Sequence, residues 1–247
     1  MIVQLRSELR KMRTTRTNLG LVLGLLGIVL LTVLAAGLSM DSRLVNDPEQ
    51  QLQLLRNGTN ASIFAALIGV LAMSSEFRHG TIRSTFVFTP NRARVVVAKV
   101  VAGLLVGAGF GALGEAFAFG VGALVLRGRG ASLEIGGSDL RVLFLGTIGL
   151  CALWAALGVG TGAVVRNQVL AVVGLSVWAF VVEVILFAYA PAVARYGPGA
   201  AGRAMTGDRT NADSVHLLSA TGGTILLALW VLLFTVAGVA VIRRRDV

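Results

Sequence analysis

Two acidic side chains lie inside long apolar stretches of this sequence, and they are the first candidates for chemistry. These residues are Glu115 and Glu183. A carboxylate at the centre of a bilayer costs about 2.5–3.5 kcal/mol on insertion scales, so such acids often mark functional sites. We interpret both as candidates for a translocation path, where they would bind a cationic group or draw in water. The alternative is a structural acid packed between helices and hydrogen-bonded, with Trp154 or Thr147 as its partner.

The residue types that usually support catalysis or metal binding are sparse. The chain has two histidines, His79 and His216, and one cysteine, Cys151. A P-loop requires Gly-Lys followed by Ser or Thr, and neither Lys11 nor Lys99 follows a glycine. Intramembrane serine proteolysis requires a histidine near an embedded serine, and both histidines lie outside the apolar stretches. We therefore expect a non-enzymatic chain without a metal site or a directly bound cofactor.

The segment 74–94 is the most informative loop. It reads Ser-Ser-Glu-Phe-Arg-His-Gly-Thr-Ile-Arg-Ser-Thr-Phe-Val-Phe-Thr-Pro-Asn-Arg-Ala-Arg. Ile82 and Phe86 are four residues apart and would share one helix face, and Pro90 ends a preceding helix. The pattern predicts a short amphipathic helix of about ten residues. Its aromatic side chains are costly to expose unless lipid headgroups or a protein cover them.

A second amphipathic segment opens the chain. Ile2, Leu5, Leu9 and Met12 recur at intervals of three and four, which places them on one helix face, with arginines on another. A basic amphipathic helix of this kind lies in the headgroup layer of a membrane. We predict an interface helix within residues 1–18, which either fixes the topology or also contacts a partner.

The elements that must position all these residues are membrane spans. Of 247 residues, 55% are hydrophobic and 14% are charged, with a mean hydropathy of +0.82. Soluble domains carry about 25% charged residues, so a soluble enzyme and a disordered chain are disfavoured. A helix crosses the hydrocarbon in about 20 residues. We predict an all-α membrane protein, one transmembrane domain over residues 1–247, with six transmembrane helices at about 19–38, 60–75, 95–126, 142–165, 168–190 and 221–242.

The loops on the other side of these spans carry their own signals. Asp47 suits a helix N-cap, Pro48 suits the first helical position and Gly58 suits a C-terminal stop. These residues predict a short helix over about 48–56. The loop 191–220 is rich in Gly, Ala and Pro, and we expect either a mobile lid or a partly ordered segment there.

Small residues recur at a spacing that brings helices close together. Gly103, Gly107 and Gly111 are four residues apart, and the pairs 20/24 and 158/162 repeat the interval. This spacing lets helix backbones approach closely in lipid. We interpret it as packing within one subunit, with a dimer interface as the alternative.

The net charge of +10 reports orientation. Six spans place both termini on one side, together with the loop 76–94, and that side carries 14 of the 22 Lys and Arg residues. By the positive-inside rule this side is cytoplasmic. The basic excess therefore fixes topology and does not indicate nucleic-acid binding.

The same loop resembles a known family. Glu-Phe-Arg-x-Gly-Thr-Ile-Arg at 76–83, Thr-Pro-x-Arg at 89–92 and Ala-Lys at 98–99 resemble the permease subunits of ABC-2 type ABC transporters, which include bacterial multidrug and antibiotic exporters. The Ser-Glu-Leu-Arg-Lys opening at 7–11 is also typical of them, so the resemblance spans the whole chain. In that family the loop between spans two and three forms a cytoplasmic coupling helix that docks into the ATP-binding subunit.

The resemblance implies a set of roles and partners. ATP and Mg²⁺ would bind a separate subunit in two copies, beside a second permease copy or a related permease, in the bacterial cytoplasmic membrane. The cargo would be amphiphilic, such as a drug, an antibiotic or a lipid-like molecule. The residues that would couple to the ATP-binding subunit, with Lys99 as a further match to the family pattern, are Glu76, Arg78, Gly80, Thr81, Arg83, Phe86, Pro90 and Arg92.

Two other classes of function compete with this one. An ion-coupled secondary transporter would use Glu115 and Glu183, although such carriers usually show two related halves, and no internal repeat is evident. A non-transporting membrane scaffold or sensor is the other alternative.

Overall fold

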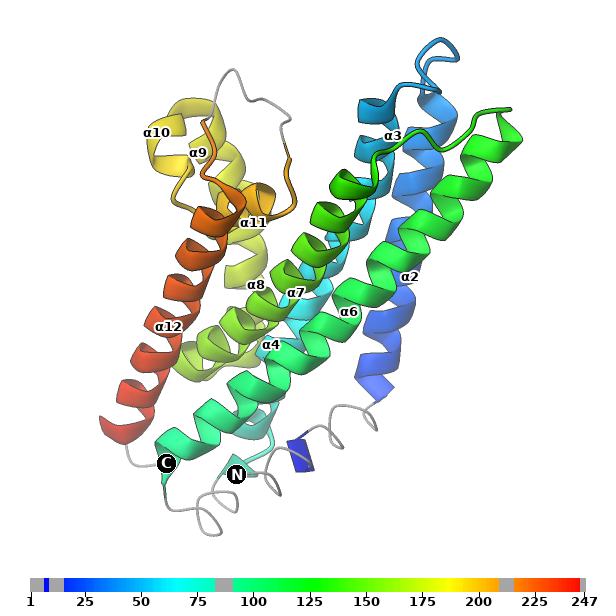
Figure 1. The fold of residues 1–247 in the computed structure, drawn as a ribbon. Helices are drawn as coiled ribbons and strands as arrows, with labels where there is room; N and C mark the ends of the chain where they lie inside the picture. The colour runs from blue at the N-terminus through cyan, green and yellow to red at the C-terminus, as the bar shows by residue number, and fades with distance from the viewer. Residues whose placement is uncertain (1–6, 9–15, 83–90, 209–215, 245–247) are drawn as a thin grey trace.

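The computed structural model describes residues 7–8, 16–82, 91–208 and 216–244, and in these ranges its regular structure is entirely helical (Figure 1). The helices, with η1 a 3-10 helix and η2 a π-helix, are α2 (Arg16–Ser39), α3 (Pro48–Leu55), η1 (Arg56–Asn60), α4 (Ala61–Arg78), α6 (Arg92–Gly128), α7 (Gly137–Val165), α8 (Gln168–Val177), η2 (Trp178–Val182), α9 (Glu183–Tyr189), α10 (Pro191–Ala194), α11 (Pro198–Met205) and α12 (Ala220–Arg244).

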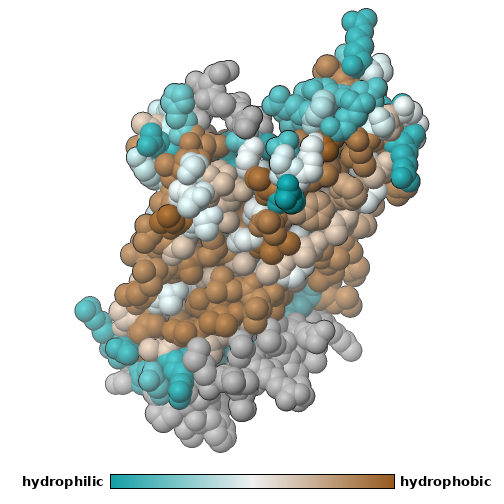
Figure 2. Space-filling view, in the orientation of Figure 1, coloured by the Kyte–Doolittle hydropathy of each residue, from teal (hydrophilic) through white to brown (hydrophobic). Residues whose placement is uncertain are grey.

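Six helical segments are long and apolar enough to cross a membrane, and each contains or matches one predicted span. The second segment extends well beyond the predicted 60–75, because α3, η1 and α4 follow one another over Pro48–Arg78. A broad apolar band covers the visible face of the bundle between two hydrophilic ends (Figure 2). The predicted all-α architecture is therefore confirmed in the described residues, and its six candidate spans support a multi-pass membrane protein.

The short helix before the second span has the predicted bounds, since α3 covers Pro48–Leu55, but Gly58 is not its stop signal. The Asp47 side chain accepts a hydrogen bond from the Glu49 N–H at the start of α3. At Gly58 the chain stays helical and continues through η1 into α4, so the predicted stop is wrong. Gly58 instead serves packing, because a Cβ atom there would lie 2.8 Å from the Cα atom of Glu115 on α6.

The three middle helices form the centre of the bundle. In the candidate spans that contain α4, α6 and α7, half or more of the most apolar 18-residue stretch is buried inside the protein. In the spans of α2, α8–α9 and α12 the buried share of the same stretch is only 17–22%. Gly107 and Gly111 of α6 face the backbone of α7, with the α7 carbonyl of Thr147 2.8 Å from where a Cβ at Gly111 would lie. Packing within one subunit, predicted from the glycine spacing, is confirmed for this pair of helices.

Two apolar clusters share the central helices. The Cys151 cluster joins α2, α4, α6 and α7, with Leu25 and Phe110 among its members. The Trp154 cluster joins α4, α7, α8, α11 and α12, with Leu175 and Leu227 among its members. Because α4 and α7 contribute to both clusters, they connect the half of the bundle around Cys151 to the half around Trp154.

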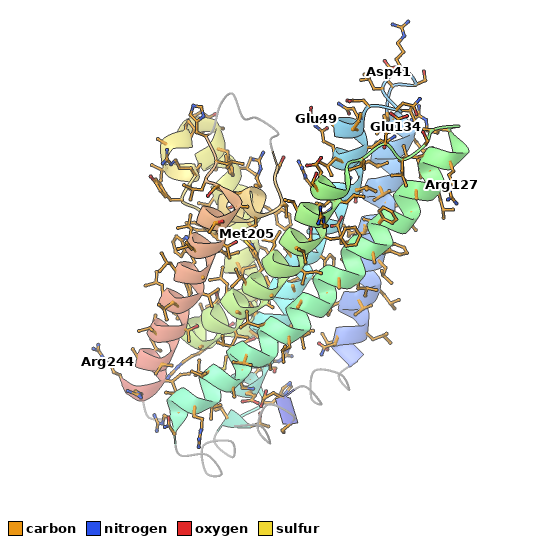
Figure 3. All side chains as sticks on the ribbon, in the orientation of Figure 1. Asp41, Glu49, Arg127, Glu134, Met205 and Arg244 are labelled. Carbon is orange, nitrogen blue, oxygen red and sulfur yellow. The ribbon has the colours of Figure 1, made fainter. Side chains whose placement is uncertain are left out.

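The polar residues gather at the two ends of the bundle. Arg244 lies at one end, and Asp41, Glu49, Arg127 and Glu134 lie at the other (Figure 3). We call these the Arg244 end and the Asp41 end. The segment predicted as a lid or a partly ordered loop contains α10 and α11, which lie toward the Asp41 end, so it is partly ordered in the described residues (Figure 1).

Candidate functional site

A buried ion cluster lies at the Arg244 end, where α4 finishes and α6 begins. The ammonium Nζ of Lys99 lies 2.6 Å from Oε2 of Glu8 and 2.8 Å from Oε1 of Glu76. It also donates to the carbonyl oxygen of Ala72 at 3.2 Å. Lys99 is fully buried, and the two acids are nearly so. All three ammonium donors thus have acceptors, which is the condition for keeping such a charge away from water.

This Lys99 cluster joins three parts of the chain that are distant in sequence. Glu8 comes from the segment before the first span, Glu76 from the last turn of α4 and Lys99 from the third turn of α6. The resemblance pointed to Glu76 and Lys99 but not to their pairing. Glu76 is nearly fully buried, and its pair with Lys99 positions the end of α4.

The other predicted coupling residues lie around this cluster. Arg78 is exposed and donates to Gln168 Oε1 of α8 at 3.3 Å. Gly80 has a positive φ of 68°, which suits glycine at the turn that ends α4. Thr81 is exposed, whereas its neighbour Ile82 is buried. The remaining predicted residues of the loop, Arg83, Phe86 and Pro90, lie outside the described residues.

Two arginines hold the end of α12. Arg92 Nη1 donates to the carbonyl oxygen of Ile242 at 2.7 Å, and Arg166 Nη2 donates to that of Val241 at 2.9 Å. Basic side chains that bond the last carbonyls of a helix stabilise its C-terminus. Arg92, a predicted coupling residue, therefore connects the start of α6 to the end of α12.

A polar cavity of about 450 Å³ opens beside the Lys99 cluster. Glu8 and Glu76 reach its wall, and the starts of α2 and α8 and the turn after α4 complete it. Arg78, His79 and Thr81 also line it. The cavity shows that several predicted coupling residues surround one hollow at the Arg244 end.

Glu115 is fully buried in the centre of α6. The hydroxyl of Thr147 on α7 donates to its Oε2 at 3.0 Å, so one of the two partners named from the sequence is correct. Its Oε1 is buried and has no hydrogen-bond partner among the described residues. The carboxylate lies against Gly58 of η1. Glu115 therefore lies where α6, α7 and η1 meet, and its predicted place on a translocation path stays a prediction.

Glu183 has a different environment. Its Oε1 accepts hydrogen bonds from the indole N–H of Trp178 at 3.1 Å and from the backbone N–H of Gly199 at 2.7 Å. Trp178, rather than the suggested Trp154, is its tryptophan partner. Gly199 is the second residue of α11, whose own N-cap, Gly197, offers no side chain. Glu183 thus supplies the acceptor that the start of α11 lacks.

A further ion cluster at the Asp41 end was not predicted. Arg56 of η1 pairs with Asp208 at 2.9 Å and donates to the Gly207 carbonyl at 3.0 Å, and Arg203 of α11 pairs with Asp208 at 2.8 Å. Arg56 and Asp208 are about 150 residues apart, and the sequence pattern gave no signal that would join them. The cluster fastens the segment after α11 to η1.

The described residues contain no group of three or more His, Cys, Asp or Glu side chains placed to hold a metal ion. A scan against protein-family models finds no match for this chain, and a search of curated proteins finds no match either.

Proposed function

We propose that this chain is the membrane-spanning permease subunit of an ATP-driven exporter of the ABC-2 type. It would lie in the bacterial cytoplasmic membrane with the Arg244 end and both termini on the cytoplasmic side. Two copies of a separate subunit would bind ATP and Mg²⁺, and a second permease copy or a related permease would complete the assembly. The cargo would be an amphiphilic molecule such as a drug, an antibiotic or a lipid.

The observation that carries this proposal is the Lys99 cluster. A coupling loop can move spans only if the helices at its two ends are fastened to it and to each other. The Glu76–Lys99 pair fastens the end of α4 to the start of α6, and Arg92 extends the connection to α12. Glu8 adds the segment that precedes the first span.

The packing of the bundle suggests how such a motion would spread. Glycine contacts hold α4, α6 and α7 close together, because Gly158 of α7 and Gly107 of α6 each face the backbone of a neighbouring helix. The remaining span segments bury far less of their surface. A force at the loop 76–94 would therefore shift the three central helices as a unit, relative to α2, α8 and α12.

The direct test is copurification with an ATP-binding subunit encoded beside this chain. We expect the complex to hydrolyse ATP and to move cargo into inside-out vesicles. Replacing Arg83 with Glu in the coupling loop should abolish cargo-stimulated ATPase activity. The exposed Arg127→Glu variant at the Asp41 end is the matched control and should retain it. Failure to recover an ATP-binding subunit, or an unchanged Arg83→Glu complex, would contradict the proposal.

One observation favours the ion-coupled carrier as a second candidate. Glu115 has a buried carboxylate oxygen without a hydrogen-bond partner among the described residues, and such a group is typical of ion-binding acids in carriers. Under this alternative, purified chain in liposomes would transport cargo in response to an ion gradient without ATP. The Glu115→Gln variant would then lose transport, and a requirement for ATP would exclude the alternative.

A further inference from the structure

An apolar cavity of about 260 Å³ lies on the side of the bundle away from Glu115. Its floor is α7, its two walls are α8 with η2 and α12, and Pro198 of α11 closes one end. All three tryptophans of the chain, Trp154, Trp178 and Trp230, line it. Neither the predicted coupling residues nor the two intramembrane acids belong to its lining.

The aromatic rings in this cavity form one group. The ring centroids of Trp178 and Trp230 are 6.4 Å apart, and those of Trp230 and Phe234 are 6.1 Å apart. Both pairs are tilted rather than stacked flat. Aromatic rings prefer offset or edge-to-face neighbours at such separations.

The polar groups of the lining are nearly all used within the protein. The indole N–H groups of Trp178 and Trp230 and the hydroxyl of Thr161 each donate to a protein oxygen. The Nε1 atom of Trp154 lies beside Gly202 of α11, 3.6 Å from where a Cβ atom of that glycine would be. No charged side chain lines the cavity. A charged ligand would therefore lose its hydration without gaining a partner, whereas an uncharged apolar one would not pay this cost.

The cavity is reached from the bilayer side of α8. Gly174 lines it, and an added Cβ atom there would meet nothing within 4 Å. Trp178 is 37% exposed at the same edge. Since α8 and α12 are both apolar spans that leave most of their surface unburied, a molecule dissolved in the lipid could enter between them.

We propose that this cavity binds a small, uncharged, flat aromatic molecule of about two rings that enters from the bilayer. An apolar cavity of about 150 Å³ is enough to hold benzene, so the larger volume here suits a bicyclic ring system. Its rings would pack against the tryptophan rings in the offset or edge-to-face arrangement that aromatic groups prefer. The site needs neither ATP nor a partner subunit, so it stands or falls separately from the proposed function.

The tryptophan content makes the test direct. Because every tryptophan lines the cavity, the intrinsic emission of the purified full chain reports on this one site. We expect 2-acetylnaphthalene, added to the chain in nanodiscs, to quench this emission saturably. Acetylcyclohexane, which lacks the flat ring, and a naphthyl trimethylammonium salt, which is charged, should each bind at least tenfold more weakly.

Blocking variants identify the site. Gly174→Phe should fill the cavity and weaken binding at least tenfold, with Val165→Phe, also in the lining, as a second blocking variant. Gly120→Phe on α6 adds the same ring at another open glycine and should bind as the wild type does. Equal quenching in blocked and control variants would overturn the proposal. So would equal affinity for the charged salt, or quenching by brominated acyl chains that the aromatic probe cannot displace.

Discussion

Lys99 shows how one side chain can make a membrane junction specific. A single lysine near the end of an apolar run could extend to the headgroups, as long basic side chains do near helix ends. Here it turns inward and uses its three donors on Glu8, Glu76 and the Ala72 carbonyl. The junction of α4, α6 and the N-terminal segment therefore depends on charge complementarity rather than on apolar contact alone.

Removing that ammonium should destabilise the protein strongly. Lys99→Met keeps the apolar stem but leaves two buried carboxylates together, and breaking a buried ion pair costs about 3–5 kcal/mol. We expect a clear fall in the melting temperature of the chain in detergent. Arg94→Met removes an exposed positive charge from the same helix and should change the melting temperature little. Equal melting of the two variants would show that the cluster does not stabilise the fold.

The acidic partners of Lys99 can be narrowed down from the sequence. The side predicted to be cytoplasmic has only three acids in the sequence, Glu8, Glu76 and Asp246. A lysine expected within a span needs an acidic partner, so few acids could pair with Lys99. What the sequence could not provide is geometry, because the turn after α4 and the pitch of α6 decide which of these acids reaches Nζ.

The hydrogen bonds of Glu183 predict how its replacement affects the start of α11. Glu183→Ala removes the acceptor for the Trp178 and Gly199 N–H groups, and the loss of a helix cap costs about 1 kcal/mol. We expect a lower melting temperature and an altered tryptophan emission. Glu183→Gln retains a carbonyl oxygen and should stay close to the wild type in both measurements. A Gln variant as unstable as the Ala variant would mean that the negative charge, rather than the acceptor, is required.

At the scale of elements, the sequence predicted helices better than their ends. All six apolar runs became span segments, because length and hydropathy are local properties. Gly58 did not end its helix, because side-chain bonds from Asn57 and Thr59 to preceding carbonyls support the turn. Glycine at position 58 is also favoured because a side chain there would collide with Glu115, and not because the backbone needs an unusual φ.

The close contact between α6 and α7 requires that Gly107 and Gly111, on one face of α6, have no side chains. Gly107→Leu would place four carbon atoms where the α7 backbone lies, so we expect little folded protein in detergent extracts. Gly109→Leu, two residues along on the open face of α6, adds the same atoms where nothing lies within 4 Å. It should yield folded protein at the wild-type level. Gel-filtration profiles of the two variants, made side by side, measure the difference.

At the scale of the whole molecule, the bundle carries one probe in each half. Cys151, the only cysteine, is buried in the cluster with α2 and α6. Trp154 and Trp230 lie in or against the other cluster, and Trp178 lies beside Trp230. Since α4 and α7 belong to both, we expect the halves to unfold together. Thiol labelling of Cys151 and the tryptophan emission should then change at the same temperature. Two separate transitions would show that the central helices do not couple the halves.

The Lys99 cluster also imposes an order on biogenesis. A ribosome makes Glu8 first and Glu76 next, and both acids leave the exit tunnel before Lys99 does. Until the start of α6 emerges, these carboxylates have no buried ammonium to neutralise and must remain at the wet face of the membrane. The junction can therefore close only after two spans have been inserted and the third has begun. Until residue 99 has been made, the ion cluster at the Arg244 end cannot form.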